Sequence, residues 1–298
     1  MRSETFPFPE RFAHGVSPVG PICYFDTGGH SDRLPVILVH ALGTDMTQWE
    51  YVAPVLAHHT RVIGLDLPGC GHSAKPRHRY SLRGAVQAVL GLLDHLGIQR
   101  AVLFGHSFGG AICAEAAIQH PGRVAGLILM NTSGFKRWSP VLRVLGKAAA
   151  QPFIVAPLMR HGVHRVLHQI FTARNERTEG FIRRVLSRPD PRYAWEFAHY
   201  ASPLIEDLMA DVLDHRHRLT MPTLVLWGDR DQLLRFQGVD DWVRLLPRAR
   251  LVIIKDCGHM PNLEHPEAVN AAAVGFLREL GVTEPAPPRA TEVRHGQG

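Results

Sequence analysis

The sequence contains few cysteines and no long apolar run. Its 298 residues include four cysteines, which lie far apart and form no C-x-x-C pair, so the disulphide framework of small secreted domains is excluded. We interpret the cysteines as reduced thiols of a cytoplasmic protein. The longest apolar stretches, such as Val124 to Met130, fall well short of the roughly 20 residues that cross a bilayer. We therefore predict no transmembrane segment.

The N-terminus also lacks the pattern of an export signal. Glu4, Pro7 and Pro9 interrupt the stretch where a signal peptide carries an unbroken apolar core. This pattern predicts that the chain is not exported. With 45% hydrophobic and 20% charged residues, the composition is typical of a globular protein with a sizeable core and excludes a disordered or fibrous chain.

The excess of positive charge belongs to one segment. The chain carries 33 Lys and Arg against 27 Asp and Glu, a formal net charge of +6. Residues 136–220 hold 14 of the basic and 8 of the acidic residues, which gives +6, and the rest of the chain holds 19 of each sign. No nucleic-acid-binding motif accompanies the excess, so we predict no nucleic-acid partner. A basic segment would instead attract an anionic substrate, an acidic carrier protein or an anionic membrane surface.

Short apolar runs alternate with helical patterns on both sides of the basic segment. This alternation predicts an α/β protein with a mostly parallel, doubly wound sheet covered by helices on both faces. The predicted strands are Val36 to Val39, Arg61 to Leu65, Ala101 to Phe104, Gly126 to Met130, Thr223 to Trp227 and Arg250 to Ile254. The predicted helices include Leu82 to Leu96, Ala111 to Ala117, Val239 to Leu246 and Pro266 to Leu280.

The basic segment shows helical periodicity and proline breaks but no strand pattern. We predict a sheet-containing core from residues 1–135 and 221–280, and a helical cap inserted between them at residues 136–220. The proline-containing end, residues 281–298, has no core-forming pattern and is expected to be disordered. The aromatic residues of the cap either line an apolar pocket or form its own core; they are Trp138, Phe153, Phe171, Trp195, Phe197 and Tyr200.

Ser107 lies at the centre of a G-x-S-x-G motif. The motif directly follows the predicted strand Ala101 to Phe104 and directly precedes a helix of small residues. A sharp strand-to-helix turn holds its central residue in strained geometry and leaves no room for side chains around it, which explains the glycines on either side. This is the sequence context of a nucleophile elbow. From roughly Leu34 to Leu280, the chain resembles a capped, esterase-like or lipase-like serine hydrolase of the α/β-hydrolase superfamily.

A serine hydroxyl needs a base to act as a nucleophile, and the base needs an acid to fix its tautomer. The order expected for this superfamily is Ser, then Asp or Glu, then His. Asp231 follows the strand that ends at Trp227, and His259 follows the strand that ends at Ile254. Ser107, Asp231 and His259 are therefore the predicted triad. The resemblance favours Asp231 over Asp229, because relatives carry the acid at the last place of this G-x-x-D turn.

The resemblance also implies an oxyanion hole of two backbone N–H groups. One belongs to the residue after the nucleophile, Phe108. The second is predicted at Leu42, in the loop His40-Ala-Leu-Gly-Thr44, which resembles the H-G-x-x-G loop of the family. The chain departs from that pattern at Ala41, where glycine is usual, so the backbone angles of the turn are in question.

No cofactor or metal is predicted. The segment Asp66 to Ala74 matches G-x-G-x-x-A, but no helix that could bind a pyrophosphate follows it. His161, His164, Arg165 and His168 recur on one face of a helix. This face is a solvated surface, an anion-binding stripe or a metal site, and we predict the first because no carboxylate or thiolate accompanies it.

These features predict a serine hydrolase that cleaves an ester-like bond of a small molecule through an acyl-enzyme. A serine nucleophile excludes the haloalkane dehalogenase and epoxide hydrolase pattern, which needs a carboxylate. Carbon–carbon bond hydrolases, perhydrolases and acyltransferases use the same triad and stay open. A ligand-binding or accessory protein of the same fold is the alternative from another functional class.

Overall fold

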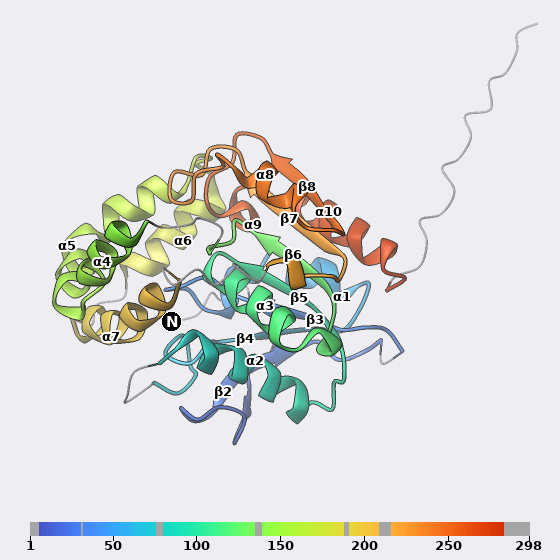
Figure 1. Cartoon of the computed structure of the whole chain (residues 1–298). Helices are drawn as coiled ribbons and strands as arrows, with labels where there is room; N and C mark the ends of the chain where they lie inside the picture. Colours follow the sequence, from blue (N-terminus) through green and yellow to red (C-terminus); the bar gives the residue numbers. More distant parts are fainter. Residues whose placement is uncertain are drawn as a thin grey trace, which may run out of the picture.

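The structure is a computed structural model and describes residues 6–30, 32–75, 80–134, 139–187, 191–208 and 216–282. An eight-stranded sheet forms its centre, with the strand order β1-β2-β4-β3-β5-β6-β7-β8 (Figure 1). The strands are β1 (Arg11–Ala13), β2 (Ile22–Asp26), β3 (Val36–Val39), β4 (Val62–Leu65), β5 (Ala101–His106), β6 (Val124–Met130), β7 (Thr223–Gly228) and β8 (Ala249–Ile254).

Six of these strands are parallel, and all six are predicted from the sequence within a few residues. β3 pairs with β4 and β5, and β6 to β8 continue the parallel order. The antiparallel strands β1 and β2 extend the sheet at one edge and are absent from the predicted set. β6 shows why parallel strands read as continuous apolar runs, since all seven of its residues are buried.

Helices cover both faces of the sheet and enclose two apolar cores. On one face α2 (Leu82–His95), α3 (Phe108–Gln119) and α8 (Val239–Arg244) cover the sheet. On the other face lie η1 (Met46–Trp49), α1 (Ala53–Ala57) and α10 (Pro266–Glu279). The short α9 (Pro261–Glu264) precedes α10, and η2 (Pro121–Arg123) precedes β6. This is the predicted doubly wound α/β architecture.

Four helices lie between β6 and β7, where the helical segment is predicted. They are α4 (Pro140–Ala149), α5 (Pro152–Ile170), α6 (Glu176–Leu186) and α7 (Pro191–Leu208), followed by η3 (Arg216–Arg218). The four helices gather to the left of the sheet in Figure 1, and α4 and α5 both pack on α7. The domain boundaries at residues 136 and 220 stay a prediction, and residues 136–138 lie outside the described residues.

The aromatic residues of this segment differ from one another in burial. Phe171 and Tyr200 are buried, and Tyr200 packs against Gly69 of the core. Phe153 is 65% exposed, so it does not belong to a core of this segment. The side chains of Trp138 and Trp195 lie outside the described residues, as do residues 283–298 of the tail that is predicted from residue 281 on. At the start of that tail, Val282 is 2% exposed and its N–H donates to the carbonyl of Leu277, so this part of the predicted tail packs on the core.

Among the described helices none is long and apolar enough to cross a membrane by itself. One bent pair of segments, Val141–Ala149 with Pro152–Leu158, passes the same test of length and composition, with an angle of 66° between its halves. The four cysteines are free and buried.

Candidate active site

Ser107 forms the tip of a tight turn between β5 and α3. Its φ is 52° and its ψ is −115°, a conformation that costs a non-glycine residue energy and persists only where packing enforces it. A Cβ on Gly105 would meet the backbone of Gly109, and a Cβ on Gly109 would meet the carbonyl of Val39. The glycines of the motif therefore permit the close approach of backbones that holds Ser107 in place.

The structure brings Ser107, His259 and Asp231 together. Nδ1 of His259 lies 2.8 Å from Oδ2 of Asp231, and Nε2 lies 3.0 Å from Oγ of Ser107. Because a carboxylate only accepts hydrogen bonds, His259 carries its proton on Nδ1, and Nε2 accepts from the serine hydroxyl. Asp231 and His259 are each 4% exposed and Ser107 is 9% exposed, so the array is largely shielded from water.

The carboxylate of Asp231 accepts hydrogen bonds on both oxygens. Oδ1 accepts the N–H groups of Leu233 and Leu234, each at 2.8 Å. Burial raises the pKa of Asp231, but the hydrogen bond and charge of His259 and further hydrogen bonds outweigh burial, and the pKa lies below its usual value. Asp229 instead accepts from the N–H of Cys257, which agrees with the preference for Asp231.

Asn131 adds a contact that the sequence did not reveal. It follows β6 with a φ of 40° and donates from Nδ2 to Oδ2 of Asp231 at 2.6 Å. Its Oδ1 accepts from the N–H of Gly228, so both ends of the amide are bonded. Asn131 therefore fixes the acid from the turn that follows β6.

The oxyanion hole stays a prediction, with Leu42 and Phe108 as its two expected backbone donors. No acceptor among the described residues is bonded to the backbone N–H of either residue, so both donors are available. The left-handed residue of the loop is Gly43, with a φ of 78°, whereas Ala41 is not among the positive-φ residues. Alanine is therefore compatible with this turn, and the question raised by the missing glycine is resolved.

The side chains of Gln48 and His40 hold this loop in place through hydrogen bonds. Oε1 of Gln48 accepts from the N–H of Ala41 and from the hydroxyl of Thr44. Nε2 of His40 accepts from the N–H of Leu67 at 2.9 Å, and Nδ1 lies 2.7 Å from the carbonyl of Ala41. The loop after β3 is thus tied to the loop after β4 by buried side chains.

Comparison with known proteins agrees with this geometry. Residues 35–266 match the family described as alpha/beta hydrolase fold. The chain belongs to this family. The nucleophile elbow predicted a member of the α/β-hydrolase superfamily with its fold. The family match confirms both the family and the fold.

Individual relatives of this α/β-hydrolase differ in their chemistry. The chain is 33% identical over 260 residues, 86% of its length, to the dihydrolipoyllysine-residue acetyltransferase component of an acetoin cleaving system from Pseudomonas putida, of which it spans 66%. It is 29% identical to the 2-hydroxy-6-oxononadienedioate/2-hydroxy-6-oxononatrienedioate hydrolase of Cupriavidus pinatubonensis, covering 85% of this chain and 89% of that protein. Among solved structures, a thermophilic esterase from Thermogutta terrifontis matches with a TM-score of 0.76 and 28% identity, covering 91% and 99% of the two chains.

His106, beside the nucleophile, is a fully buried residue of this α/β-hydrolase. Its Nε2 donates to the carbonyl of His259 at 2.7 Å, and its Nδ1 lies 3.4 Å from Nε2 of Gln48. Burial, followed by the charge of His259, lowers the pKa of His106 to about 3. His106 therefore stays neutral and holds the backbone of the His259 loop.

Glu264 is the second residue whose importance the sequence did not show. It is 2% exposed. Its carboxylate accepts from the N–H groups of Gly258 and Met260 in the His259 loop. It also accepts from the N–H groups of Thr172 and Ala173, between α5 and α6. Glu264 thus joins the loop that carries His259 to the inserted helices.

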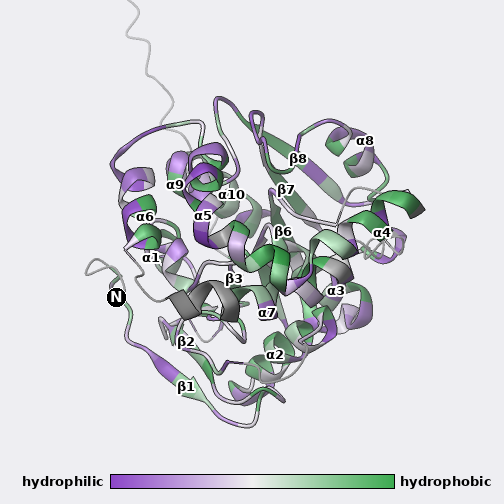
Figure 2. Cartoon of the chain, turned by 90° about the vertical axis from the view of Figure 1, so that its left-hand side faces the viewer, coloured by the Kyte–Doolittle hydropathy of each residue, from purple (hydrophilic) through white to green (hydrophobic). Residues whose placement is uncertain are grey.

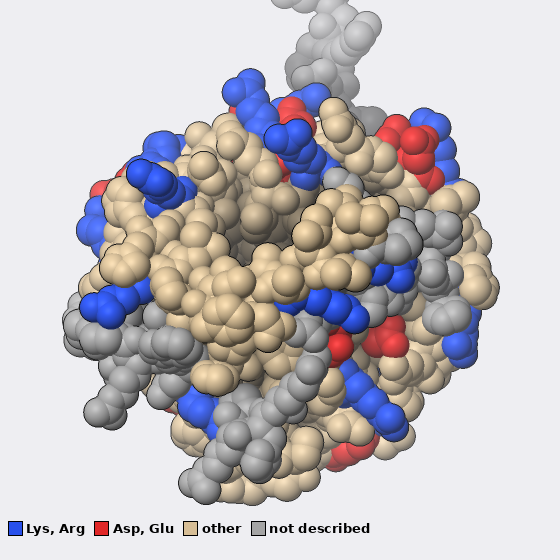
Figure 3. Space-filling model, turned by 60° about the vertical axis from the view of Figure 1, so that its left-hand side comes forward, with Lys and Arg blue, Asp and Glu red and all other residues tan. Residues whose placement is uncertain are grey.

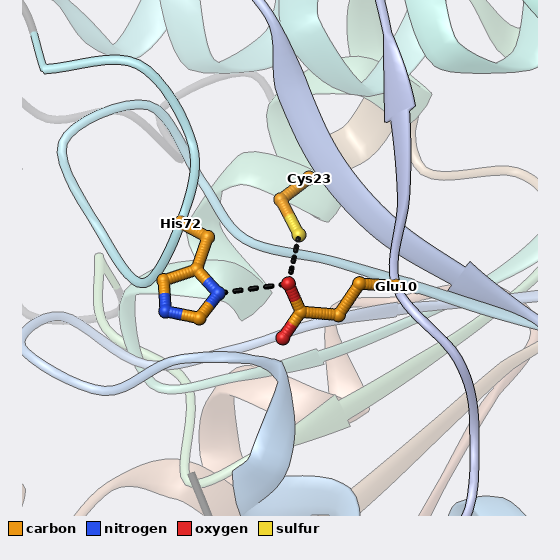
Figure 4. Close-up of side chains that lie close together, drawn as sticks. All are labelled: Glu10, Cys23 and His72. Carbon is orange, nitrogen blue, oxygen red and sulfur yellow. Dashed lines mark hydrogen bonds and ion pairs between the residues drawn. The ribbon is translucent and has the colours of Figure 1, made fainter. Parts of the chain in front are cut away.

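One cluster among the described residues offers three ligand types that could hold a metal ion. Glu10, Cys23 and His72 present donor atoms within 4.8 Å of one another (Figure 4). Oε2 of Glu10 accepts from Nδ1 of His72 at 2.8 Å and from Sγ of Cys23 at 3.7 Å. These hydrogen bonds satisfy the carboxylate without a metal.

The histidine-rich face lies on α5, as predicted. His161, His164 and Arg165 are exposed, and Nε2 of His168 lies 3.1 Å from Nε2 of His164. Arg174 lies against the other ring nitrogen of His168. The positive charge of the Arg174 guanidinium beside His168 disfavours a bound metal ion at the pair.

Proposed function

We propose that this α/β-hydrolase is a serine hydrolase that cleaves an ester-like bond through an acyl-enzyme. The observation that supports the proposal most is the continuous hydrogen-bonded line from Ser107 through His259 to Asp231. Each member has the neighbour that its role requires: a nucleophile beside a base, and a base beside an ionised acid.

In this mechanism Oγ of Ser107 attacks the carbonyl carbon while Nε2 of His259 takes the hydroxyl proton. The carbonyl oxygen becomes an oxyanion, which the N–H groups of Phe108 and Leu42 stabilise by about 3 kcal/mol per donor. The imidazolium of His259 then protonates the leaving alkoxide, and the ester C–O bond breaks. Water, deprotonated by His259, attacks the acyl-enzyme and releases the acid and Ser107.

Asp231 has an electrostatic role in this scheme. Its lowered pKa keeps it ionised, so that it holds the Nδ1 proton and stabilises the imidazolium. It does not take the proton itself.

The direct test is labelling of the purified chain with a fluorophosphonate probe, alongside turnover of p-nitrophenyl esters. Ser107→Ala should abolish labelling and lower kcat by about 10⁴-fold or more. Ser17→Ala is a matched control, because Ser17 has the same exposed fraction of 9% and bonds to the N–H of Val19. Turnover that survives in a folded Ser107→Ala protein would overturn the proposal. A folded wild-type chain that never labels would favour a ligand-binding protein.

Carbon–carbon bond hydrolysis is the second candidate. It is supported by the relative from Cupriavidus pinatubonensis, which is named as a hydrolase of 2-hydroxy-6-oxo-dienedioates and aligns with 85% of this chain. A panel of aryl esters with graded acyl chains, set against a vinylogous 1,5-diketone, separates the two. An ester kcat/KM that exceeds the diketone value supports the esterase. The reverse order assigns carbon–carbon hydrolysis to the same residues, and transfer of the acyl group to an added alcohol or thiol rather than to water would indicate an acyltransferase.

A further inference from the structure

Helices α4 and α5 expose large apolar side chains where they meet. We call this surface the apolar tip. Its members and their exposed fractions are Val141 68%, Leu142 47%, Val144 68%, Leu145 60%, Phe153 65%, Ile154 42% and Leu158 60%. Contiguous exposed apolar surface is rare on monomeric soluble proteins and marks a place of interaction.

The apolar face of α4 turns outward. Val141, Val144, Leu145 and Ala148 recur at the three- and four-residue spacing of one helix face. In an ordinary surface helix this face turns to the core, but here all four residues are exposed. The helix contacts α7, with Ala150 buried and Gly146 half-buried at its inner side. Most of α4 has the colour of hydrophobic residues in Figure 2.

The charged residues of α4 and α5 all have one sign. The sequence contains no Asp or Glu from residue 116 to residue 175. Lys147 lies on α4 and Arg160 and Arg165 lie on α5, and all three are exposed. On the face of the molecule in Figure 3, uncharged surface surrounds a hollow, and Lys and Arg side chains lie further out with some Asp and Glu side chains beside them.

The exposed residues of α5 are apolar in its first two turns and mainly basic after them. Phe153, Ile154 and Leu158 occupy its first two turns, and Arg160, His161 and Arg165 follow. The chain bends by 66° between Val141–Ala149 and Pro152–Leu158, which places two short apolar segments at one corner. Neither segment is long enough to span a bilayer. An apolar corner with a basic flank is the composition of helices that lie at the boundary of acyl chains and headgroups.

We infer that the apolar tip docks on an anionic lipid bilayer, with its apolar side chains among the acyl chains and its cations against lipid phosphates. The one-signed charge favours this partner over a second copy of the chain, because a symmetric contact would bring the cations of both copies together. It also favours a bilayer over an acidic protein, since charge attraction alone leaves the apolar side chains without a partner. The inference does not rest on the proposed chemistry and can be tested in Ser107→Ala.

The experiment is co-sedimentation of the full chain, carrying Ser107→Ala, with two kinds of vesicle. One kind is pure phosphatidylcholine and the other has equal parts of phosphatidylcholine and phosphatidylglycerol. We expect tighter binding to the second kind. Leu145→Glu should weaken that binding by about tenfold or more. Leu245→Glu is the matched control, because Leu245 is 57% exposed but lies at the end of α8, and it should bind like the parent.

A second pair of variants tests the charge. Arg160→Gln with Arg165→Gln should weaken binding to the anionic vesicles by about 25-fold at low salt, since each juxtamembrane cation contributes about fivefold. Arg83→Gln, an exposed cation on α2, should leave binding unchanged. Added salt should weaken the parent and have less effect on the double variant.

Three results would overturn the inference. The first is an absence of binding to either kind of vesicle. The second is a concentration-dependent dimer in analytical ultracentrifugation that Leu145→Glu converts to a monomer, because the tip would then be an interface between copies. The third is vesicle binding that survives Leu145→Glu and is lost only with the two arginines, because the apolar side chains would then have no part in docking. Circular dichroism melts of each variant show that it is folded.

Discussion

The candidate active site buries polar side chains, whereas the apolar tip exposes apolar ones. At the site, charged and polar side chains are buried and bonded; Asp231 is 4% exposed and has four hydrogen-bond partners. At the tip, apolar side chains such as Leu145 are mostly exposed. Burying a polar group stabilises a fold only where its partners are in place, whereas exposing an apolar one costs little to the fold. The site should therefore be sensitive to substitution, and the tip should be tolerant.

The largest effect is expected for the proposed acid. Asp231→Asn keeps the size of the side chain but removes the charge and places a donor toward Nδ1 of His259, which favours the wrong tautomer. We expect kcat to fall by about 10³- to 10⁴-fold. Steady-state turnover of an aryl ester measures this, and Asp229→Asn, whose side chain bonds to Cys257, is the control. Equal losses in both variants would contradict the assignment.

The next largest effect is expected for Glu264, whose carboxylate joins the His259 loop to the chain between α5 and α6. Glu264→Gln would place an NH₂ donor against backbone N–H groups that the carboxylate now satisfies. We expect the free energy of unfolding to fall by about 2–4 kcal/mol. Urea denaturation measures the change.

Glu267→Gln is the matched control for Glu264. Glu267 lies three residues further on, with a side chain 76% exposed and paired with Arg177, so its loss should cost less than about 1 kcal/mol. If both variants lose equal stability, the buried carboxylate has no special role, and the contrast between buried and exposed polar groups fails.

His106 should make stability depend on pH. Its pKa is lowered from 6.5 to about 3 in the folded chain, so below pH 6.5 the unfolded chain takes up a proton that the folded chain does not. The free energy of unfolding therefore falls as the pH falls toward 3. Between pH 7 and pH 5 this single group contributes a loss of about 2 kcal/mol.

The variant His106→Gln isolates that contribution. Glutamine has a donor for the carbonyl of His259 but no proton to gain in this range. Urea denaturation of both proteins at pH 7 and pH 5 should show a smaller loss in the variant. Parallel losses in the two proteins would show that His106 is not the source.

The smallest effect is expected at the apolar tip. Leu145→Glu should change the free energy of unfolding by less than about 0.5 kcal/mol, because the side chain loses almost no buried contact. Leu103→Ala in β5, at a fully buried position, should cost about 2–5 kcal/mol. Thermal melts compare the two. A large loss in Leu145→Glu would show that the tip belongs to the core.

Most of the fold follows from local patterns. The six parallel strands are short apolar runs bounded by turn residues, and five of them, all except β8 at the edge, are buried on both faces, which requires that composition. The antiparallel strands β1 and β2 were not predicted. β1 has three residues, of which two are exposed, so it carries no apolar pattern.

The residues of the candidate site also fall into two groups, those that the sequence predicts and those that it does not. Ser107, Asp231 and His259 each follow a strand in a recognisable turn, and the structure places all three within hydrogen-bonding reach. Asn131 and Glu264 belong to no such motif, and His106 occupies a position of the elbow motif that the motif leaves open. Each of the three has a partner far away in the chain, at 100, 153 and about 90 residues for Asn131, His106 and Glu264, and these contacts leave no pattern in the sequence.

By itself, the sequence determined the elbow, the order of Ser, Asp and His, and the confinement of the net charge to the helical segment. These depend on steric limits of the backbone and on composition, which are local. Only the tertiary structure decided that Asn131 and Glu264 bond at the site and that the apolar face of α4 turns outward. The helical pattern of α4 is the same whether its face is buried or exposed, and the neighbours that decide between the two come from the fold.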